Sequence, residues 1–127
     1  MAQSSLVSVV VDDESVRESL PDLLREFGFS VQAFSSAEAF LQSEWMALTQ
    51  CLVLDIAMPG MTGPELQREL AHREPDMPIV FMTAHATEVA RPGMIGKSAV
   101  ACLIKPFSPG DLLEAINTGL RRGRPSR

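Results

Sequence analysis

Residues 51–63 read CLVLDIAMPGMTG, an apolar run that ends in a carboxylate and leads into a turn. Asp55 closes the run, and a carboxylate at the end of a buried strand requires a partner, because burying an unpaired charge is costly. The proline and glycine residues that follow indicate a turn, which leaves the backbone around Asp55 exposed. The stretch therefore predicts a buried strand with one reactive carboxylate at its carboxyl end.

Four similar apolar runs lie on either side of this stretch. All are rich in Val, Ile, Leu and Phe without strict alternation, which is typical of strands buried on both faces. The five expected strands are residues 6–11, 29–34, 51–56, 79–82 and 100–104. Amphipathic segments between and after them predict helices at residues 15–27, 37 to about 45, 64–73, near 87–97, and 108–120.

Strand and helix thus alternate five times, which predicts an α/β fold. Parallel neighbours need crossover connections, so the sheet is expected to be parallel and covered by helices on both sides. A chain of 127 residues with 46% hydrophobic content is the size of one ordinary domain. We expect that domain at residues 1–120 and a basic tail, or the start of a linker, at residues 121–127.

Two of the expected helices contain residues that interrupt helices. Pro21 falls inside the first one, where it should kink the helix or restart it. Pro92, Gly93 and Gly96 fall inside the fourth, which is therefore expected to be short, displaced or mobile.

Polar side chains follow four of the expected strands. Asp12 and Asp13 come after the first strand, Asp55 closes the third, Thr83 follows the fourth and Lys105 follows the fifth. In open sheets with helices on both faces, function sits outside the carboxyl ends of the strands. These side chains are therefore expected to meet at one edge of the sheet.

Three carboxylates at one edge would repel one another unless a cation were present. Ligation by oxygen atoms, with room for water, favours Mg²⁺, which uses one or two carboxylates together with phosphate oxygens of a substrate. For Asp12 and Asp13 taken alone, a solvated loop that caps the following helix is an equally good interpretation.

The same set of groups is suited to phosphoryl transfer. Attack by Asp55 on a phosphoryl group would give an aspartyl phosphate, with Lys105 and the metal neutralising charge and Thr83 donating a hydrogen bond. Thr83 or Lys105 taken singly is better interpreted as an ordinary loop residue. The prediction therefore depends on the combination.

The charge distribution limits the partners of this chain. Its formal net charge is −5, and four of its eleven basic residues lie beyond residue 120. An acidic body does not favour binding of nucleic acid, which requires clustered Lys and Arg. No apolar run is long enough for a membrane helix, so we expect a soluble, cytoplasmic protein that does not bind membranes.

The two cysteines, Cys51 and Cys102, both fall inside expected strands. Neither lies in a CxxC pattern or near a set of histidines that would indicate metal or redox chemistry. We interpret both as reduced core residues.

Four strings, VVVDDE, LVLDIAMPGMTG, IVFMTAH and LIKPF, occur in this order and spacing. Together they resemble the receiver domains of response regulators in two-component signalling, over nearly all of residues 5–120. The resemblance implies a flavodoxin-like, doubly wound fold whose five-stranded parallel sheet has the order 2-1-3-4-5.

The resemblance also implies roles for individual residues. Asp13 would bind Mg²⁺ directly, Asp12 through water, and the backbone carbonyl of Ala57 would complete the protein ligands. The third acidic ligand would be Asp55, which is also the phosphoacceptor. Thr83 and Lys105 would bind the phosphoryl group.

The partners follow from the family as well. A sensor histidine kinase would donate the phosphoryl group, and the domain would catalyse only its own phosphorylation and dephosphorylation rather than turn over as an enzyme. Residues 14–41, ESVRESLPDLLREFGFSVQAFSSAEAFL, together with KPF, resemble the FixJ-type branch. Full-length members of that branch carry a helix-turn-helix output domain, so control of transcription is the expected output. Nucleic acid would be bound only through such a domain, which this chain does not contain.

The sequence departs from the family pattern at two positions near the site. Cys102 stands where members usually have Tyr or Phe, so switching is expected to use the Thr83 loop, the fourth helix or another side chain. The face formed by helix four, strand five and helix five is where such domains commonly dimerise. Ala57 is small and uncharged, which we expect to leave the phosphoryl group open to water.

Two hypotheses remain for the function. The first is a switch that changes its partner-binding face on phosphorylation. The second is a constitutive pseudo-receiver, an interaction module that keeps the acidic site without switching. A nucleotide or flavin carrier lacks its Gly-rich loop here, and a hydrolase of the aspartyl-phosphate type would need a DxD pair where the chain has Asp55, Ile56 and Ala57.

Overall fold

Strand and helix alternate along the chain as the hydrophobic pattern predicts. The computed structural model describes residues 5–58, 60–73, 77–83 and 99–122. Its elements are β1 Leu6–Val10, α1 Glu14–Glu26, β2 Ser30–Phe34, α2 Ala37–Leu41, the 3₁₀ helix η1 Met46–Leu48, β3 Cys51–Asp55, α3 Gly63–Arg73, β4 Ile79–Thr83, β5 Ala99–Ile104 and α5 Pro109–Arg122. The fourth helix that we expected, with Pro92, Gly93 and Gly96, lies outside the described residues.

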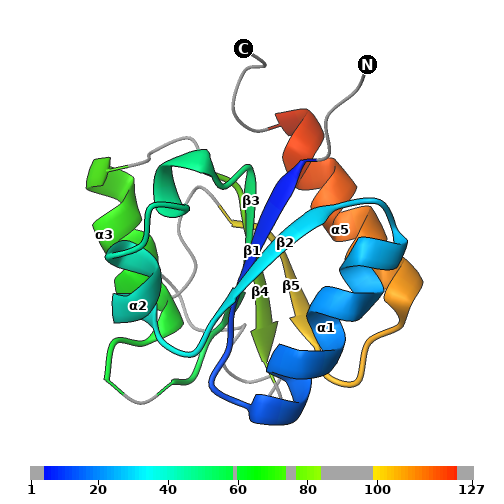
Figure 1. The fold of residues 1–127 in the computed structure, drawn as a ribbon, viewed down its shortest axis with the longest axis horizontal. Coiled ribbons are helices and arrows are strands. Elements are labelled where there is room, and N and C mark those ends of the chain that lie inside the picture. The colour runs from blue at the N-terminus through cyan, green and yellow to red at the C-terminus, as the bar shows by residue number, and fades with distance from the viewer. Residues whose placement is uncertain (1–4, 59, 74–76, 84–98, 123–127) are drawn as a thin grey trace.

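All five strands form one parallel sheet in the order β2-β1-β3-β4-β5. This confirms the predicted fold class and strand order. Figure 1 shows α1 and α5 on one side of the sheet and α2 and α3 on the other. Parallel strands require such crossover helices, and the reversal of strand order at β1 and β3 leaves room at their carboxyl ends.

Alternate residues of the central strands face the two helical layers. In β3, Cys51 and Val53 belong to the core shared with α1 and α5, whereas Leu52 and Leu54 belong to the core shared with α2 and α3. All four side chains are completely buried. Full burial of an aliphatic side chain of this size stabilises a fold by about 1.5–3 kcal/mol, so β3 anchors both layers.

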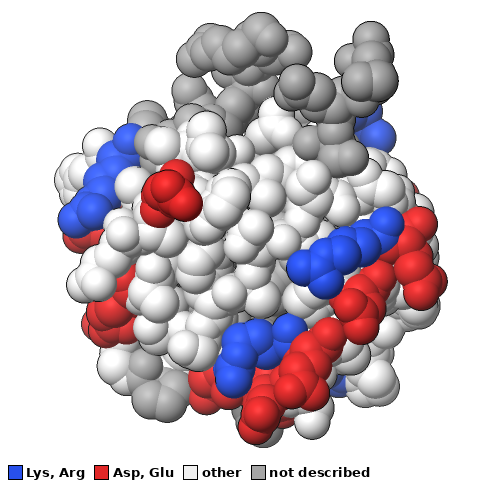
Figure 2. Space-filling view, in the orientation of Figure 1, with Lys and Arg blue, Asp and Glu red and all other residues white. Residues whose placement is uncertain are grey.

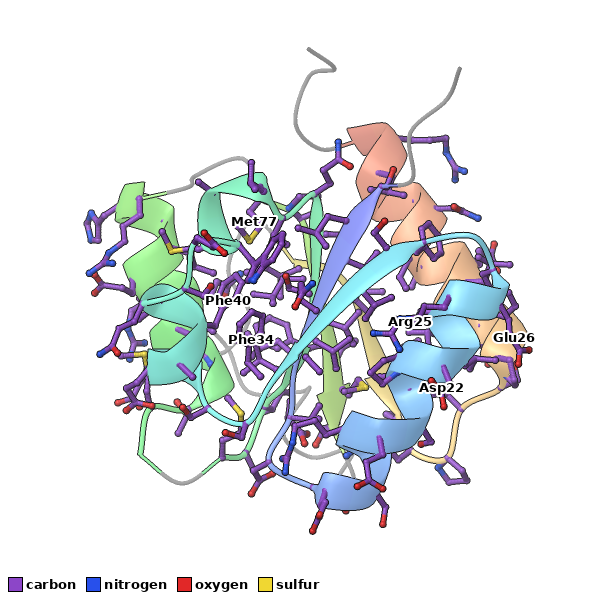
Figure 3. The ribbon with its side chains drawn as sticks, in the orientation of Figure 1. Asp22, Arg25, Glu26, Phe34, Phe40 and Met77 are labelled. Carbon is purple, nitrogen blue, oxygen red and sulfur yellow. The ribbon has the colours of Figure 1, made fainter. Side chains whose placement is uncertain are left out.

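An aromatic pair packs between the sheet and the layer formed by α2 and α3. The rings of Phe34 and Phe40 meet edge to face with their centroids 5.3 Å apart. Figure 3 shows this pair in the layer beside α2, with Met77 above it. Phe40 and Met77 are completely buried, so α2 is held against the sheet despite its short length.

Two of the expected helices differ from their predictions. α1 runs without a break through Pro21, which is buried inside it, so the expected restart is wrong. The burial of Leu20 and Leu24 on either side of the proline offsets its missing hydrogen bond. α2 ends at Leu41 instead of near residue 45, because Ser43 donates its hydroxyl to the carbonyl of Phe40 and competes with the helical bonds.

The two cysteines differ in burial. Cys51 is completely buried in β3, where burial raises the pKa of its thiol to about 12. Cys102 is only half-buried, because β5 is an edge strand with β4 as its one neighbour. The prediction that both are core residues is therefore confirmed for Cys51, whereas Cys102 packs against the core without being fully buried. Neither thiol is in a disulfide.

Among the described helices, none has the length and apolar character needed to cross a membrane.

Candidate functional site

The predicted polar residues meet at the carboxyl edge of the sheet, the lower edge in Figure 1 toward which the β4 and β5 arrowheads point. Strand register explains the meeting. Asp55, the last residue of β3, pairs with Met82, and Thr83, the last residue of β4, pairs with Ile104. The amide of Lys105 then donates to the carbonyl of Thr83 at 2.8 Å, which ties the end of β5 to the end of β4.

Asp55 is the buried carboxylate of the site, with 6% of its surface exposed. The Nζ of Lys105 lies 3.4 Å from its Oδ2. Burial raises the pKa of Asp55 above its ordinary value, and the charges of Asp12 and Asp13 raise it further, while the charge and hydrogen bond of Lys105 lower it. The pKa of Asp55 is thus raised overall, and Lys105 limits the rise.

Asp12 and Asp13 are both exposed on the loop between β1 and α1. Asp13 is the N-cap of α1, because its Oδ1 accepts a hydrogen bond from the amide of Val16 at 3.1 Å. The capping role that we considered for this pair is thus confirmed for Asp13. A carboxylate has four lone-pair sites, so one capping bond leaves Asp13 able to bind a cation.

The donor set of this edge suits Mg²⁺. The charges of the exposed Asp12 and Asp13, together with burial, raise the pKa of Asp55. A divalent cation would offset the repulsion among the three carboxylates and favour the ionised form of Asp55. Within the described ranges, no three His, Cys, Asp or Glu side chains are grouped closely enough to hold a metal ion by themselves. A cation held here would take further ligands from water or from a bound phosphoryl group, as Mg²⁺ does.

The remaining predicted residues lie after β3 and on the two strands beyond it, β4 and β5. Ala57 is exposed two positions after it, and Thr83 is buried at the end of β4. Cys102 pairs with Phe81 in the sheet and packs against the core under α2 and α3. Cys102 also lies three residues before Lys105, on the edge strand β5, whose carboxyl end reaches the site.

Gly63, the first residue of α3, is a residue of this site that no sequence pattern singled out. Its amide donates to the carbonyl of Ile56 at 2.9 Å. A Cβ atom at this position would fall on the backbone carbonyl oxygen of Asp55 and 3.0 Å from the Cα of Ile56. The absence of a side chain thus lets α3 start directly against the end of β3.

A reciprocal cap also fixes the start of α3. The amide of Thr62 donates to Oε1 of Glu65 at 2.8 Å, and the amide of Glu65 donates to Oγ1 of Thr62 at 3.3 Å. The T-x-x-E spacing is the sequence signal of such a capping box, and it could have identified this contact in advance. The box and Gly63 together anchor the far end of the loop that begins at Asp55.

Negative charge extends from the site along α1. The exposed acidic residues of this helix recur every four positions, so they share one face; they are Glu14, Glu18, Asp22 and Glu26. Figure 2 shows this band over α1, with basic side chains beside it. The predicted acidic body is thus evident on this face.

Comparison with known proteins agrees with this geometry. The family model described as the response regulator receiver domain matches residues 7–117. Nodulation protein W of Bradyrhizobium diazoefficiens is 41% identical over 123 residues, which are 97% of this chain and 54% of that protein. The transcriptional regulatory protein FixJ of Azorhizobium caulinodans is 36% identical over 122 residues, 96% of this chain and 58% of FixJ. The chain thus spans about half the length of the curated relatives it matches.

Solved structures give the same result. The response regulator StyR superposes with a TM-score of 0.85 at 44% identity, covering 94% of this chain and 60% of StyR. FixJ-N superposes with a TM-score of 0.82 at 33% identity, covering 98% of this chain and 100% of FixJ-N. The response regulator protein TrrA of Thermotoga maritima, solved in complex with Mg²⁺-BeF, has a TM-score of 0.82 at 26% identity, covering 91% and 99% of the two chains.

Proposed function

Because the chain belongs to the response regulator receiver domain family, we propose that Asp55 accepts a phosphoryl group from a sensor histidine kinase. The observation that carries the proposal is the pairing of buried Asp55 with Lys105, 3.4 Å apart, at the edge where Asp12 and Asp13 also lie. In this reaction a carboxylate oxygen of Asp55 forms a bond to phosphorus while the bond from phosphorus to the donor breaks.

Lys105 has two consecutive tasks in this mechanism. Before transfer, its charge and hydrogen bond favour the ionised, nucleophilic form of Asp55. After transfer, the same ammonium group is within reach of the phosphoryl oxygens and offsets their charge. Thr83, the last residue of the neighbouring strand, would donate its hydroxyl to another phosphoryl oxygen.

Mg²⁺ is the cofactor that we propose for this site. Asp12, Asp13, Asp55 and the carbonyl of Ala57 would hold it, with Asp12 acting through water. When bound, it would offset the charge of the carboxylates and of the phosphoryl oxygens. TrrA, a relative at 26% identity, was solved in complex with Mg²⁺-BeF, which supports this assignment.

We further propose that phosphorylation changes the partner-binding face next to β5. Cys102 is half-buried there and Ile104 is 44% exposed, so a shift of the Thr83 loop would alter an accessible apolar edge. Conversion from mostly inactive to mostly active requires about 5.5 kcal/mol of differential stabilisation. The face formed by the fourth helix, β5 and α5 would then dimerise.

The output that we propose is control of transcription. TdiR and FixJ are named as transcriptional regulatory proteins, and the matched residues make up 53% and 58% of their lengths. Residues 1–120 would form the receiver domain, and residues 121–127 a basic tail or the start of a linker. The thiols of Cys51 and Cys102 fit a reducing compartment, so we place the reaction in the cytoplasm.

Intact mass after incubation with acetyl phosphate and Mg²⁺ tests this function, with Asp55→Asn as the matched variant and light scattering as a second readout. One phosphoryl adduct that requires both Mg²⁺ and Asp55, with a change in association state, supports the switch. An adduct without any change supports the constitutive pseudo-receiver module. Failure of both acetyl phosphate and a histidine kinase to modify the chain contradicts the phosphoacceptor role.

A further inference from the structure

Arg17 connects the first helix to the loop that carries Asp12 and Asp13. Its side chain is half-buried, and its Nη1 donates hydrogen bonds to the carbonyl oxygens of Val11 and Asp12, each at 3.2 Å. Bonds from an ionised guanidinium are stronger than bonds between neutral groups, and the planar guanidinium holds a fixed direction. Arg17 therefore ties two consecutive peptide groups to α1.

The backbone of Arg17 extends this contact to a third peptide group. Its amide donates to the carbonyl of Asp13 at 2.9 Å, as part of the first turn of α1. On the other side, the amide of Val11 donates to the carbonyl of Phe34 at 3.2 Å, which joins the loop to the end of β2. One residue thus binds the carbonyls of positions 11–13 in succession.

The charge of Arg17 is directed to carbonyl oxygens and not to the neighbouring carboxylates. The ion pairs found in the described part of the chain join Arg25 to Asp22, Arg73 to Glu69 and Lys105 to Asp55. Asp12 and Asp13 are therefore kept close to a cation that does not form an ion pair with either of them. Their carboxylates remain available to another cation.

We propose that Arg17 is a positioning residue for the metal site. By holding the carbonyls of Val11 and Asp12, it fixes the direction in which Asp12 and Asp13 leave the backbone and so prepares them for Mg²⁺. The inference rests on the proposed function. It adds a residue of α1 that would touch neither the metal nor the phosphoryl group.

Isothermal titration with MgCl₂ on the unphosphorylated full chain tests this role. Arg17→Met removes the hydrogen bonds and should weaken Mg²⁺ binding roughly 10-fold, as loss of a contact that orients metal ligands commonly does. Arg25→Met is the matched control: it removes the same charge from the same helix, where Arg25 lies beside Asp22 (Figure 3) and binds the carbonyl of Val31. This variant should bind Mg²⁺ within about twofold of the unmodified chain, since a surface charge pair contributes little.

Two other results would overturn the inference. Tighter Mg²⁺ binding by Arg17→Met would show that Arg17 acts only by repelling the metal. Unchanged binding together with a lower free energy of unfolding would show that Arg17 only stabilises the fold. Arg17→Lys keeps the charge and one donor, so it should fall between Arg17→Met and the unmodified chain; equal affinities of the lysine and methionine variants would contradict a positioning role.

The experiment separates this inference from the proposed function. If the unmodified chain binds no Mg²⁺ and takes no phosphoryl group, the proposed function fails and the role of Arg17 fails with it. If the unmodified chain does both and Arg17→Met binds Mg²⁺ equally well, only the role of Arg17 is wrong. Backbone amide shifts of Asp12 and Asp13 in Arg17→Lys provide a second readout if the methionine variant does not fold.

Discussion

The Nζ of Lys105 lies 3.4 Å from Oδ2 of Asp55, although 50 positions separate the two residues. β4 lies between β3, which ends at Asp55, and β5, which ends one residue before Lys105, so the lysine side chain reaches across the end of β4. Burial disfavours the negative charge of Asp55, and the positive charge of Lys105 favours it. The chemistry proposed for this edge depends on the balance between them.

Lys105→Met should slow phosphorylation of Asp55 by acetyl phosphate by about 100-fold, the usual effect of losing one donor to developing charge. Without the ammonium group, the pKa of Asp55 rises further and the phosphoryl oxygens lose a partner. The rate of adduct formation, followed by intact mass, checks this. Lys105→Arg keeps a cation, so its rate of phosphorylation should lie between those of the unmodified chain and Lys105→Met. Equal rates for all three chains would contradict the role of Lys105.

Asp55→Asn should stabilise the folded chain at neutral pH when Mg²⁺ is removed with a chelator. The pKa of Asp55 is raised in the folded state, so as pH rises through that pKa the folded chain must release a proton that the unfolded chain has already lost. The native carboxylate therefore reduces the free energy of unfolding above that pH, and asparagine does not. We expect a gain of about 1 kcal/mol, an ordinary size for one substitution.

Urea unfolding of both chains from about pH 4 to pH 7, which spans the range above an ordinary aspartate pKa, checks this prediction. The difference between them should shrink as pH falls toward the acid end, because Asp55 of the unmodified chain then takes up its proton in the folded state. Lys105, with 28% of its side chain exposed, can turn to solvent in the variant. A difference that stays constant with pH would show that the titration of Asp55 does not cause it.

The hydrophobic pattern was sufficient to predict the sheet and the edge at which the polar residues meet. Each strand is a short apolar run, and crossover helices force parallel neighbours, so the sequence alone assigns Asp12, Asp55, Thr83 and Lys105 to one edge. Strand order itself followed from the family resemblance, because periodicity does not say which strands are neighbours.

The features that the sequence did not predict depend on tertiary contacts. Pro21 lies within an unbroken helix because leucines on either side of it are buried against the sheet. Cys102 is half-buried because β5 is an edge strand, which its apolar neighbours do not reveal. The bonds of Arg17 to two carbonyls and the contact of Gly63 with Asp55 involve backbone atoms, and no residue pattern identifies those partners.

Ala57→Arg should slow the loss of the phosphoryl group from Asp55. Ala57 is exposed two positions after the phosphoacceptor, so a long side chain there can cover the approach of water. We expect about tenfold slower dephosphorylation, equivalent to about 1.4 kcal/mol in the barrier. Decay of the adduct mass after removal of the donor measures this rate. Ala57→Ser is the small-residue control, and an arginine variant that decays as fast as the serine variant would contradict the covering effect.

Gly63→Ala should destabilise the fold by about 2 kcal/mol, within the range for overpacked sites. Its new methyl group would fall on the carbonyl oxygen of Asp55, and backbone cannot move aside as a flexible side chain can. Urea unfolding measures the loss. Gly110→Ala is the matched control, because Gly110 lies in α5 and its new methyl group would be 3.8 Å from Oγ of Ser108, an ordinary contact distance. Replacing glycine by alanine in a helix usually stabilises it by up to about 1 kcal/mol. If the two variants were equally stable, the close approach of Gly63 to Asp55 would not be what holds α3 against the phosphoacceptor strand.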